Sequence, residues 1–158
     1  MAVRTNADGS RAVAGDSKGT VVAIDVRAHR VLCKYGAGAV PVTALAMTDD
    51  GTRFAIADEA GNIVTLRSDD CGKLSIANAA GAISRMLFVP NTSDLLNAAG
   101  SALELRREGG PTVTHTFRGH DAAITSIGVS RDGKLAATGA SDGTVVVWRL
   151  AKVDVSQP

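Results

Sequence analysis

Aromatic side chains and cysteines are both scarce in this sequence. Phe, Trp and Tyr together make up 3% of the 158 residues, and the two cysteines are Cys33 and Cys71. Because large rings are so few, the core has to be built from Val, Ile, Leu, Ala and Gly, which suit tightly layered sheets. Two thiols without a secretory leader do not amount to a disulfide framework. We therefore expect reduced cysteines and a cytoplasmic location, or otherwise a nuclear one.

Long apolar runs and helical periodicity are also missing. No stretch approaches the roughly 18 apolar residues of a membrane-spanning helix, and the first residues lack the apolar segment of a signal peptide. No segment keeps helical spacing over ten or more residues, so we expect almost no helix. The formal net charge of +1 gives no electrostatic basis for binding a polyanion. Neither nucleic acid nor a membrane is expected as a partner.

The strongest signal in the sequence is an internal repeat. Residues 8–26, 50–68 and 132–150 align without gaps, and their spacing leaves room for another copy that begins near residue 84. Each copy contains short strands rich in Val, Ile or Leu, separated by Asp-Gly or similar turns, and a fourth strand follows in most copies. Meanders repeated at this interval bury their faces by stacking around an axis.

The repeat predicts an all-β fold, a β-propeller with about four blades, each a four-stranded antiparallel sheet. A partial or half propeller of this kind would leave apolar faces at both ends. Three arrangements remain open: part of a larger propeller, pairing of two half-propellers, or closure of four blades alone. We expect a single domain over residues 1–158, with blades at residues 1–35, 36–77, 78–118 and 119–158.

Residues 119–150 resemble the WD-repeat family, with Gly119 and His120 opening the unit and Trp148 closing its third strand. The resemblance implies a hydrogen-bonded tetrad that locks the blade, and it assigns that role to His120, Thr138, Asp142 and Trp148. A buried Asp in such a network needs donors, which imidazole, hydroxyl and indole groups can supply. The other three copies lack this set, so we expect apolar packing to hold those blades.

No motif gathers the residue types of a catalytic site. Ser141, Asp142 and His120 include the types of a hydrolase triad, but the first two are adjacent in a tight turn and His120 is assigned to the tetrad. Residues 36–38 are a fragment of a dinucleotide fingerprint, and residues 15–20 have the wrong order for a phosphate loop. We therefore expect no enzyme activity, no cofactor and no metal site.

The fold and the resemblance favour a non-catalytic scaffold that mediates protein–protein interaction and complex assembly. Its partners would be other proteins or peptides, and a homodimer or pairing with another half-propeller is also considered. Candidate contact residues lie in turns at the same end of the sheets as the tetrad Asp: Asp16, Lys18, Asp58, Glu59, Asp121 and Ser141. Two alternatives stay open, a structural half-propeller that only completes a ring and a propeller enzyme with a central-channel site.

Overall fold

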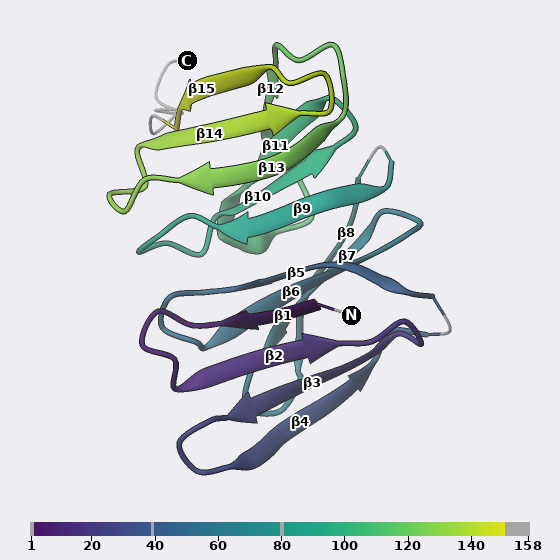
Figure 1. Cartoon of the computed structure of the whole chain (residues 1–158). Coiled ribbons are helices and arrows are strands. Elements are labelled where there is room, and N and C mark those ends of the chain that lie inside the picture. The colour runs from purple at the N-terminus through teal and green to yellow at the C-terminus, as the bar shows by residue number, and fades with distance from the viewer. Residues whose placement is uncertain (1, 39, 80, 151–158) are drawn as a thin grey trace, which may run out of the picture.

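The chain folds into four antiparallel sheets, which we call blades 1 to 4. The computed structural model describes residues 2–38, 40–79 and 81–150. Figure 1 shows the sheets stacked one above the other, with the N-terminal blade at the bottom and the last blade at the top. A single turn of 3-10 helix, Arg107–Gly109, is the only helix among the residues that the structure describes. The prediction of an all-β propeller fold with about four blades is confirmed.

Within each blade, the strands pair in the order in which they follow along the chain. Blade 1 contains β1 (Ala2–Thr5), β2 (Arg11–Gly15), β3 (Thr20–Asp25) and β4 (Arg30–Gly36). Blade 2 contains β5 (Val42–Met47), β6 (Arg53–Asp58), β7 (Asn62–Arg67) and β8 (Lys73–Asn78). Blade 3 contains β9 (Ile83–Phe88), β10 (Leu95–Ala99), β11 (Ala102–Arg106) and β12 (Val113–Arg118). The described part of blade 4 contains β13 (Ile124–Val129), β14 (Leu135–Ala140) and β15 (Val145–Arg149).

The repeat seen in the sequence recurs in the backbone. Three Asp-Gly turns join the first and second strands of blades 1, 2 and 4, and their glycines, Gly9, Gly51 and Gly133, all have a φ of +69°. A side chain is disfavoured at this left-handed angle, so glycine at these positions allows the tight turn. The sequence spacing of the turns therefore sets the spacing of the blades.

Three apolar clusters join neighbouring blades. Val21 of blade 1 packs in one cluster with Leu45 of blade 2, Ile63 of blade 2 packs in the next with Ile83 of blade 3, and a third cluster joins blades 3 and 4. Side chains alternate between the two faces of a strand, so an internal blade contributes one row to each neighbour. The innermost strands β1, β5, β9 and β13 contact one another in this order, which makes the sheets fan out from a shared centre.

Candidate functional site

A line of side-chain hydrogen bonds runs through blade 4. Trp148 on β15 donates its indole N–H to Oγ1 of Thr138 on β14 over 2.8 Å. The same oxygen lies 2.7 Å from Nε2 of His120, a residue that is only 6% exposed. Three of the four residues that the family resemblance assigns to a tetrad are therefore brought together.

Asp142, the fourth assigned residue, is reached through Thr144. Nδ1 of His120 lies 2.9 Å from Oγ1 of Thr144, and this hydroxyl donates to the carboxylate of Asp142 over 2.7 Å. Asp142 also accepts the backbone N–H of Thr144, and this bond is the main reason that the pKa of its carboxyl group is lowered. Asp142 is exposed, which differs from the buried position that the sequence argument assumed. The intervening hydroxyl spans the distance between the carboxylate at the surface and the buried imidazole.

One placement of protons satisfies every member of this line. Thr138 accepts the N–H of Trp148, which leaves its own O–H to donate to Nε2 of His120. Nδ1 then carries the ring proton and donates to Thr144, whose O–H is directed at Asp142. The imidazole thus bridges two strands, with both of its ring nitrogens engaged by hydroxyl groups.

Blade 3 contains a second buried polar cluster, which the sequence analysis missed. Arg106 is fully buried, and its guanidinium donates to Oδ1 of Asn97 and Oε2 of Glu104, each over 3.1 Å. It also donates to the backbone oxygens of Asn78 in blade 2 and of Pro111. Apolar packing was expected to hold the first three blades, and in blade 3 this buried polar cluster adds to that packing.

Strand alternation was the signal that could have revealed this cluster. Glu104 and Arg106 are two residues apart on β11, so their side chains lie on the same face, and Asn97 is paired with Glu104 across β10 and β11. On a buried face, a carboxylate, an amide and a guanidinium have to satisfy one another. These three residue types in these positions therefore indicate one buried, mutually hydrogen-bonded cluster.

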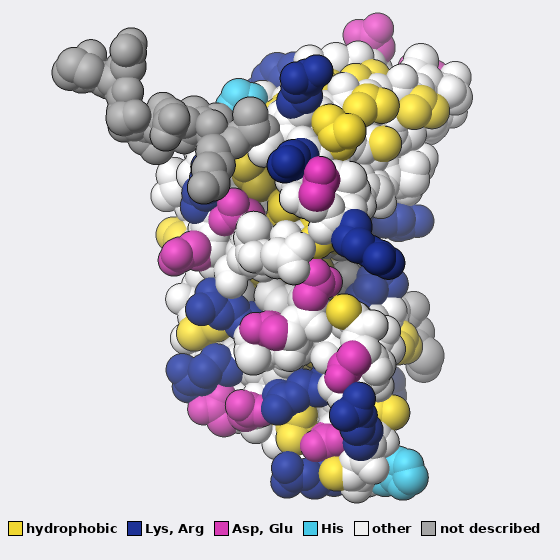
Figure 2. Space-filling view, turned by 90° about the vertical axis from the view of Figure 1, so that its left-hand side faces the viewer, with side chains coloured by type: hydrophobic (Ala, Val, Ile, Leu, Met, Phe, Trp, Pro, Cys, Tyr) yellow, Lys and Arg dark blue, Asp and Glu magenta, His cyan; other side chains and the backbone are white. Residues whose placement is uncertain are grey.

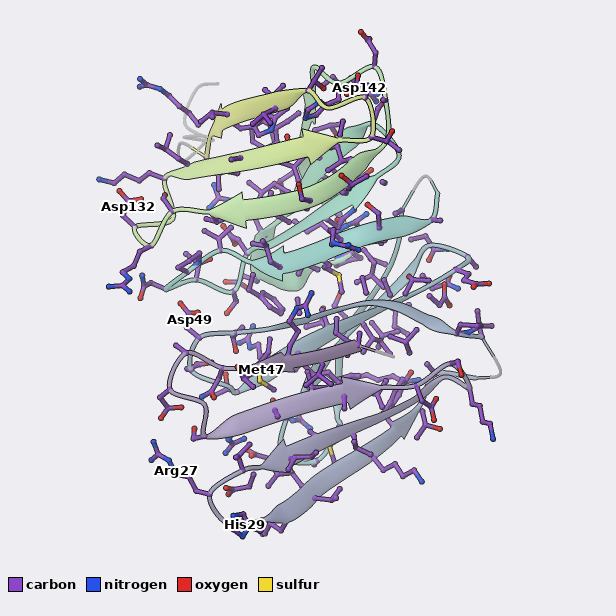
Figure 3. The ribbon with its side chains drawn as sticks, in the orientation of Figure 1. Arg27, His29, Met47, Asp49, Asp132 and Asp142 are labelled. Atoms are coloured by element: carbon purple, nitrogen blue, oxygen red, sulfur yellow. A yellow bond between two sulfur atoms is a disulfide. The ribbon has the colours of Figure 1, made fainter. Side chains whose placement is uncertain are left out.

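The six candidate contact residues lie in turns, or at a strand end beside a turn, at the end of the sheets that is marked by Asp142 in Figure 3. Lys18, Glu59, Asp121 and Ser141 are exposed there. Rigid strands flank the four turns that carry these residues, so their positions are fixed relative to one another. This end of the arc, defined by these four exposed residues, is called the docking end below.

Asp16 and Asp58 differ from the other candidates because their carboxylates are engaged within their own turns. Asp16 accepts the backbone N–H groups of Lys18 and Thr20, each over 2.8 Å. Asp58, which is 8% exposed, accepts the equivalent N–H groups of its turn and the side-chain amide of Asn62. Both side chains stabilise the turns that present their neighbours, and a role for them in contacting a partner stays a prediction.

Acidic and basic side chains are mixed at the opposite end of the sheets, which is the face seen in Figure 2. Several of them pair there, as in Arg27 with Asp8 and Arg67 with Asp70. Such exposed pairs contribute little to stability. The mixture of signs gives this face no extended field that would attract a polyanion.

The innermost strands line a cavity of about 320 Å³ between blades 1, 2 and 3. The charged side chains on its wall are Arg4 and Arg85, and its hydroxyls come from Thr43 and Ser84.

In the described part of the chain, no three His, Cys, Asp or Glu side chains lie close enough to hold a metal ion. The one helical turn in the described residues is too short to span a membrane.

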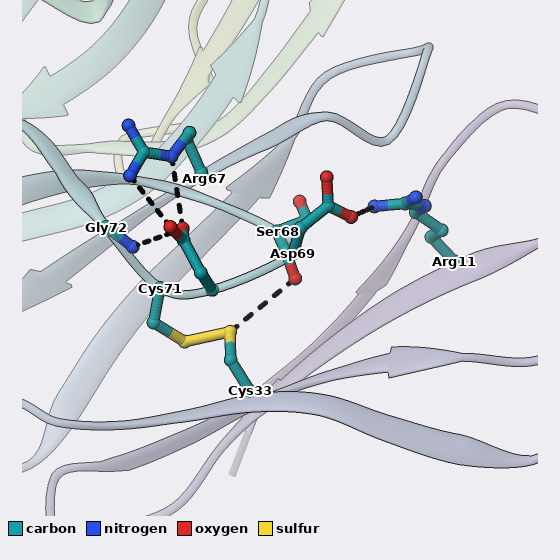
Figure 4. The surroundings of a disulfide bond; sticks show 8 residues. Arg11, Cys33, Arg67, Ser68, Asp69, Cys71 and Gly72 are labelled. Atoms are coloured by element: carbon teal, nitrogen blue, oxygen red, sulfur yellow. Dashed lines mark hydrogen bonds and ion pairs between the residues drawn. A yellow bond between two sulfur atoms is a disulfide. The ribbon is translucent and has the colours of Figure 1, made fainter.

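A disulfide joins blades 1 and 2, and the expectation of two reduced cysteines is wrong in this structure. Cys33 on β4 is bonded to Cys71 in the turn after β7, with a Cα–Cα distance of 5.7 Å. Figure 4 shows the same turn tied to its surroundings by ion pairs of Asp69 with Arg11 and of Asp70 with Arg67. The sequence could not reveal the bond, because it depends on the outer strand of one blade lying beside a turn of the next.

Comparison with known proteins places the repeat in a family. Residues 111–149 match the family described as "WD domain, G-beta repeat". Over 91 residues the chain is 40% identical to the ribosome biogenesis protein ERB1 of Chaetomium globosum, which covers 57% of this chain and 11% of that protein. Over 66 residues it is 30% identical to the human intraflagellar transport protein 122 homolog, which covers 42% of this chain and 5% of that protein. The chain thus spans only a small part of the curated relatives it matches.

Solved structures share the fold over nearly all of the chain. The structure of U3-55K matches with a TM-score of 0.82 and 20% identity, covering 94% of this chain and 48% of that one. The RRP9 WD40 repeats match with a TM-score of 0.81 and 21% identity, covering 92% and 46%. The shared architecture is that of a β-propeller built from repeated meander sheets. Residues 111–149 thus match the repeat model, and nearly all of the chain shares the propeller fold.

Proposed function

We propose that the chain is a non-catalytic scaffold whose docking end binds other proteins during the assembly of a larger complex. The observation that carries this proposal is the presentation of Lys18, Glu59, Asp121 and Ser141 on turns between packed strands. Because the strands hold the turns in place, a partner that contacts several of them loses little conformational entropy of the scaffold. The docking end thus has its binding conformation before a partner arrives.

The names of the relatives agree with a role in assembly. Two of the proteins reported above are a ribosome biogenesis protein and an intraflagellar transport protein, and another structure that shares the fold, with a TM-score of 0.80, is of the mitotic checkpoint complex. We extend to the chain only what these names have in common, which is a role in an assembly of several proteins. Its partners are proposed to be protein components of a multi-subunit particle.

The central cavity supports the non-catalytic part of the proposal. Its wall offers Arg4 and Arg85 as charged groups and contains no carboxylate or imidazole among the residues that line it. General acid–base catalysis depends on such groups within reach of a substrate. The imidazole of His120 is engaged on both ring nitrogens.

Affinity capture from cells tests the docking end. A triple variant, Lys18→Ala with Glu59→Ala and Asp121→Ala, is compared with a control that has the same changes in charge at the opposite end, Arg27→Ala with Asp49→Ala and Asp69→Ala. Each lost contact at the edge of an interface costs about 0.5 kcal/mol, so the triple variant should retain about tenfold less partner. The control should capture as much as the native chain. Equal capture by both variants contradicts the proposal and favours a purely structural role in completing a ring.

The absence of a nucleic-acid partner and the cytoplasmic location stay predictions. An anisotropy titration with a labelled RNA oligonucleotide at about 0.15 M salt should show no binding, since the net charge is +1. The disulfide bears on location, because such bonds are rare in the cytosol. Fractionation of cells with blocked thiols would report both the compartment and the oxidation state of Cys33.

A further inference from the structure

The two end blades each leave one apolar face uncovered by the described part of the chain. On blade 4, Val145 is 71% exposed and Val147 is 65% exposed, and Leu135 lies at the edge of the same face. Figure 2 shows a group of hydrophobic side chains at the top of the molecule, where blade 4 lies. Two valines on the same face of a strand are ordinarily covered by another part of the protein, so the exposure of both is unusual.

The repeat shows what this face does elsewhere in the same molecule. Val145 is equivalent to Val21 of blade 1 and to Ile63 of blade 2, which are 0% and 1% exposed. Val147 is equivalent to Ala23 and Thr65, which are also 0% and 1% exposed. In blades 1 and 2 this face carries the next blade. The exposed face of blade 4 is therefore an inter-blade surface on which no blade packs among the described residues.

The complementary surface is available on blade 1. Val3 is 51% exposed, and it shares a face with Ala14 and Val22, its neighbours across β2 and β3. The equivalent of Val3 in blade 2 is Leu45, which is 1% exposed because blade 2 rests on blade 1. Blade 4 thus exposes the face on which a following blade packs, and blade 1 exposes the face that packs on a preceding blade.

We propose that two copies of this chain associate head to tail, with the blade 4 face of each copy packed on the blade 1 face of the other. Two such contacts related by a twofold axis close a ring of eight sheets, and propeller rings of four to eight blades are known to be stable. The length of the chain agrees with this number of copies, because it covers 48% and 46% of the chains of the two solved propellers. Two copies therefore supply the sheet content of about one such propeller.

Closure of the ring would also complete the central channel. The innermost strands β1 and β13 are at opposite ends of the order in which these strands contact one another, and dimerisation would place β13 of one copy beside β1 of the other. The charged residues of the two faces lie at their margins: Arg149 is at the end of β15, and Lys34 is on the outer strand of blade 1. No charge would be buried at the middle of either contact.

Sedimentation velocity on the full chain at about 1 to 100 µM tests the proposal. The native chain should sediment as a dimer, at twice its mass of 16.1 kDa. Val147→Glu should reduce the dimer at least about tenfold, because it buries a carboxylate in both contacts. Ile76→Glu is the matched control, since Ile76 is 58% exposed on the outer strand of blade 2 and belongs to neither face. Circular dichroism checks that both variants keep the native fold, and a native monomer at 100 µM would overturn the proposal.

Mixing two variants tests the direction of packing. Val3→Lys alters the blade 1 face and Val147→Glu the blade 4 face, so each variant alone should be monomeric. In a mixed dimer of the two, one contact is unaltered and the other brings the introduced ammonium group against the introduced carboxylate, so the mixture should form a mixed dimer. If Val3→Lys remains dimeric alone, or if the mixture stays monomeric, then the contact is not head to tail and the proposal fails.

Discussion

A Cβ atom on Gly119 would lie 2.9 Å from Cη2 of Trp148. That separation is shorter than carbon atoms tolerate, so the glycine that opens the last repeat is needed for the indole to approach the backbone. Gly119 and Trp148 are 29 residues apart in the sequence, and this contact joins the connection before β13 to the end of the blade.

We expect Gly119→Ala to destabilise the chain by about 1 to 3 kcal/mol, because a methyl group would displace the ring of Trp148. Urea unfolding followed by Trp fluorescence measures the change. Gly81→Ala is the control, since a Cβ there would meet nothing within 4 Å. Equal midpoints for the two variants would contradict the close approach.

Thr138→Val keeps the shape of the side chain but removes the oxygen shared by Trp148 and His120. Leaving their nitrogens unpaired should cost about 1 to 3 kcal/mol, measured by thermal or urea unfolding. Asp142→Ala should cost less, because Asp142 is exposed and acts through Thr144. If the Asp142 variant were the less stable of the two, the order of this line of hydrogen bonds would be wrong.

Arg106→Ala should destabilise the chain by about 3 to 5 kcal/mol, because it leaves the carboxylate of Glu104 buried without its ion pair. The double variant Glu104→Leu with Arg106→Met removes both charges and should recover most of that loss. Urea unfolding of both variants provides the comparison. A double variant as unstable as the single one would show that the buried charge is not the cause.

Reduction of the Cys33–Cys71 bond should lower the free energy of unfolding by about 2 to 4 kcal/mol. The bond closes a loop with a sequence separation of 38 residues, so its loss increases the freedom of the unfolded chain. Thermal melts with and without a reductant measure this effect, and mass spectrometry after alkylation counts the free thiols. The Cys33→Ser, Cys71→Ser variant should melt identically in both conditions. A native chain that is fully reduced yet equally stable would contradict the prediction.

Asp70 gives the turn that carries Cys71 a defined pH dependence. The hydrogen bond from Arg67 is the main cause that lowers the pKa of Asp70 from 3.8 to about 2. A lowered carboxyl pKa stabilises the fold above the unfolded pKa of 3.8, and this contribution is lost as the pH falls toward 2. The loss of stability between about pH 4 and pH 2 should therefore be smaller in Asp70→Asn than in the native chain. If Asp70→Asn lost as much stability over this pH range as the native chain, the ion pair between Arg67 and Asp70 would be broken in solution.

The repeated parts of the molecule could be predicted from the sequence, because local signals specify them. The turn at Asp8-Gly9 and its equivalents at Asp50-Gly51 and Asp132-Gly133 require glycine for their backbone angle, and gapless alignment of these units set the blade spacing. The proximity of His120, Thr138 and Trp148 followed from a resemblance to known repeats. Each of these signals lies within a single unit of the chain.

Features that depend on contact between units could not be predicted in the same way. Arg106 in blade 3 reaches a backbone oxygen of Asn78 in blade 2, and Cys33 meets a turn of the following blade. Both require the relative placement of neighbouring sheets, which the repeat period does not specify. The exposure of Asp142 was missed for another reason, because Thr144 takes a place in the hydrogen bonds that the family pattern does not assign to it.

Amide hydrogen exchange resolved by residue tests most directly whether one unit recurs four times as a packed sheet. The second strands of the blades begin at Arg11, Arg53, Leu95 and Leu135. Slow exchange should therefore appear in four blocks at this spacing, separated by fast exchange at the turns between them. Protection confined to one block, or spread over a continuous stretch with helical spacing, would contradict the account.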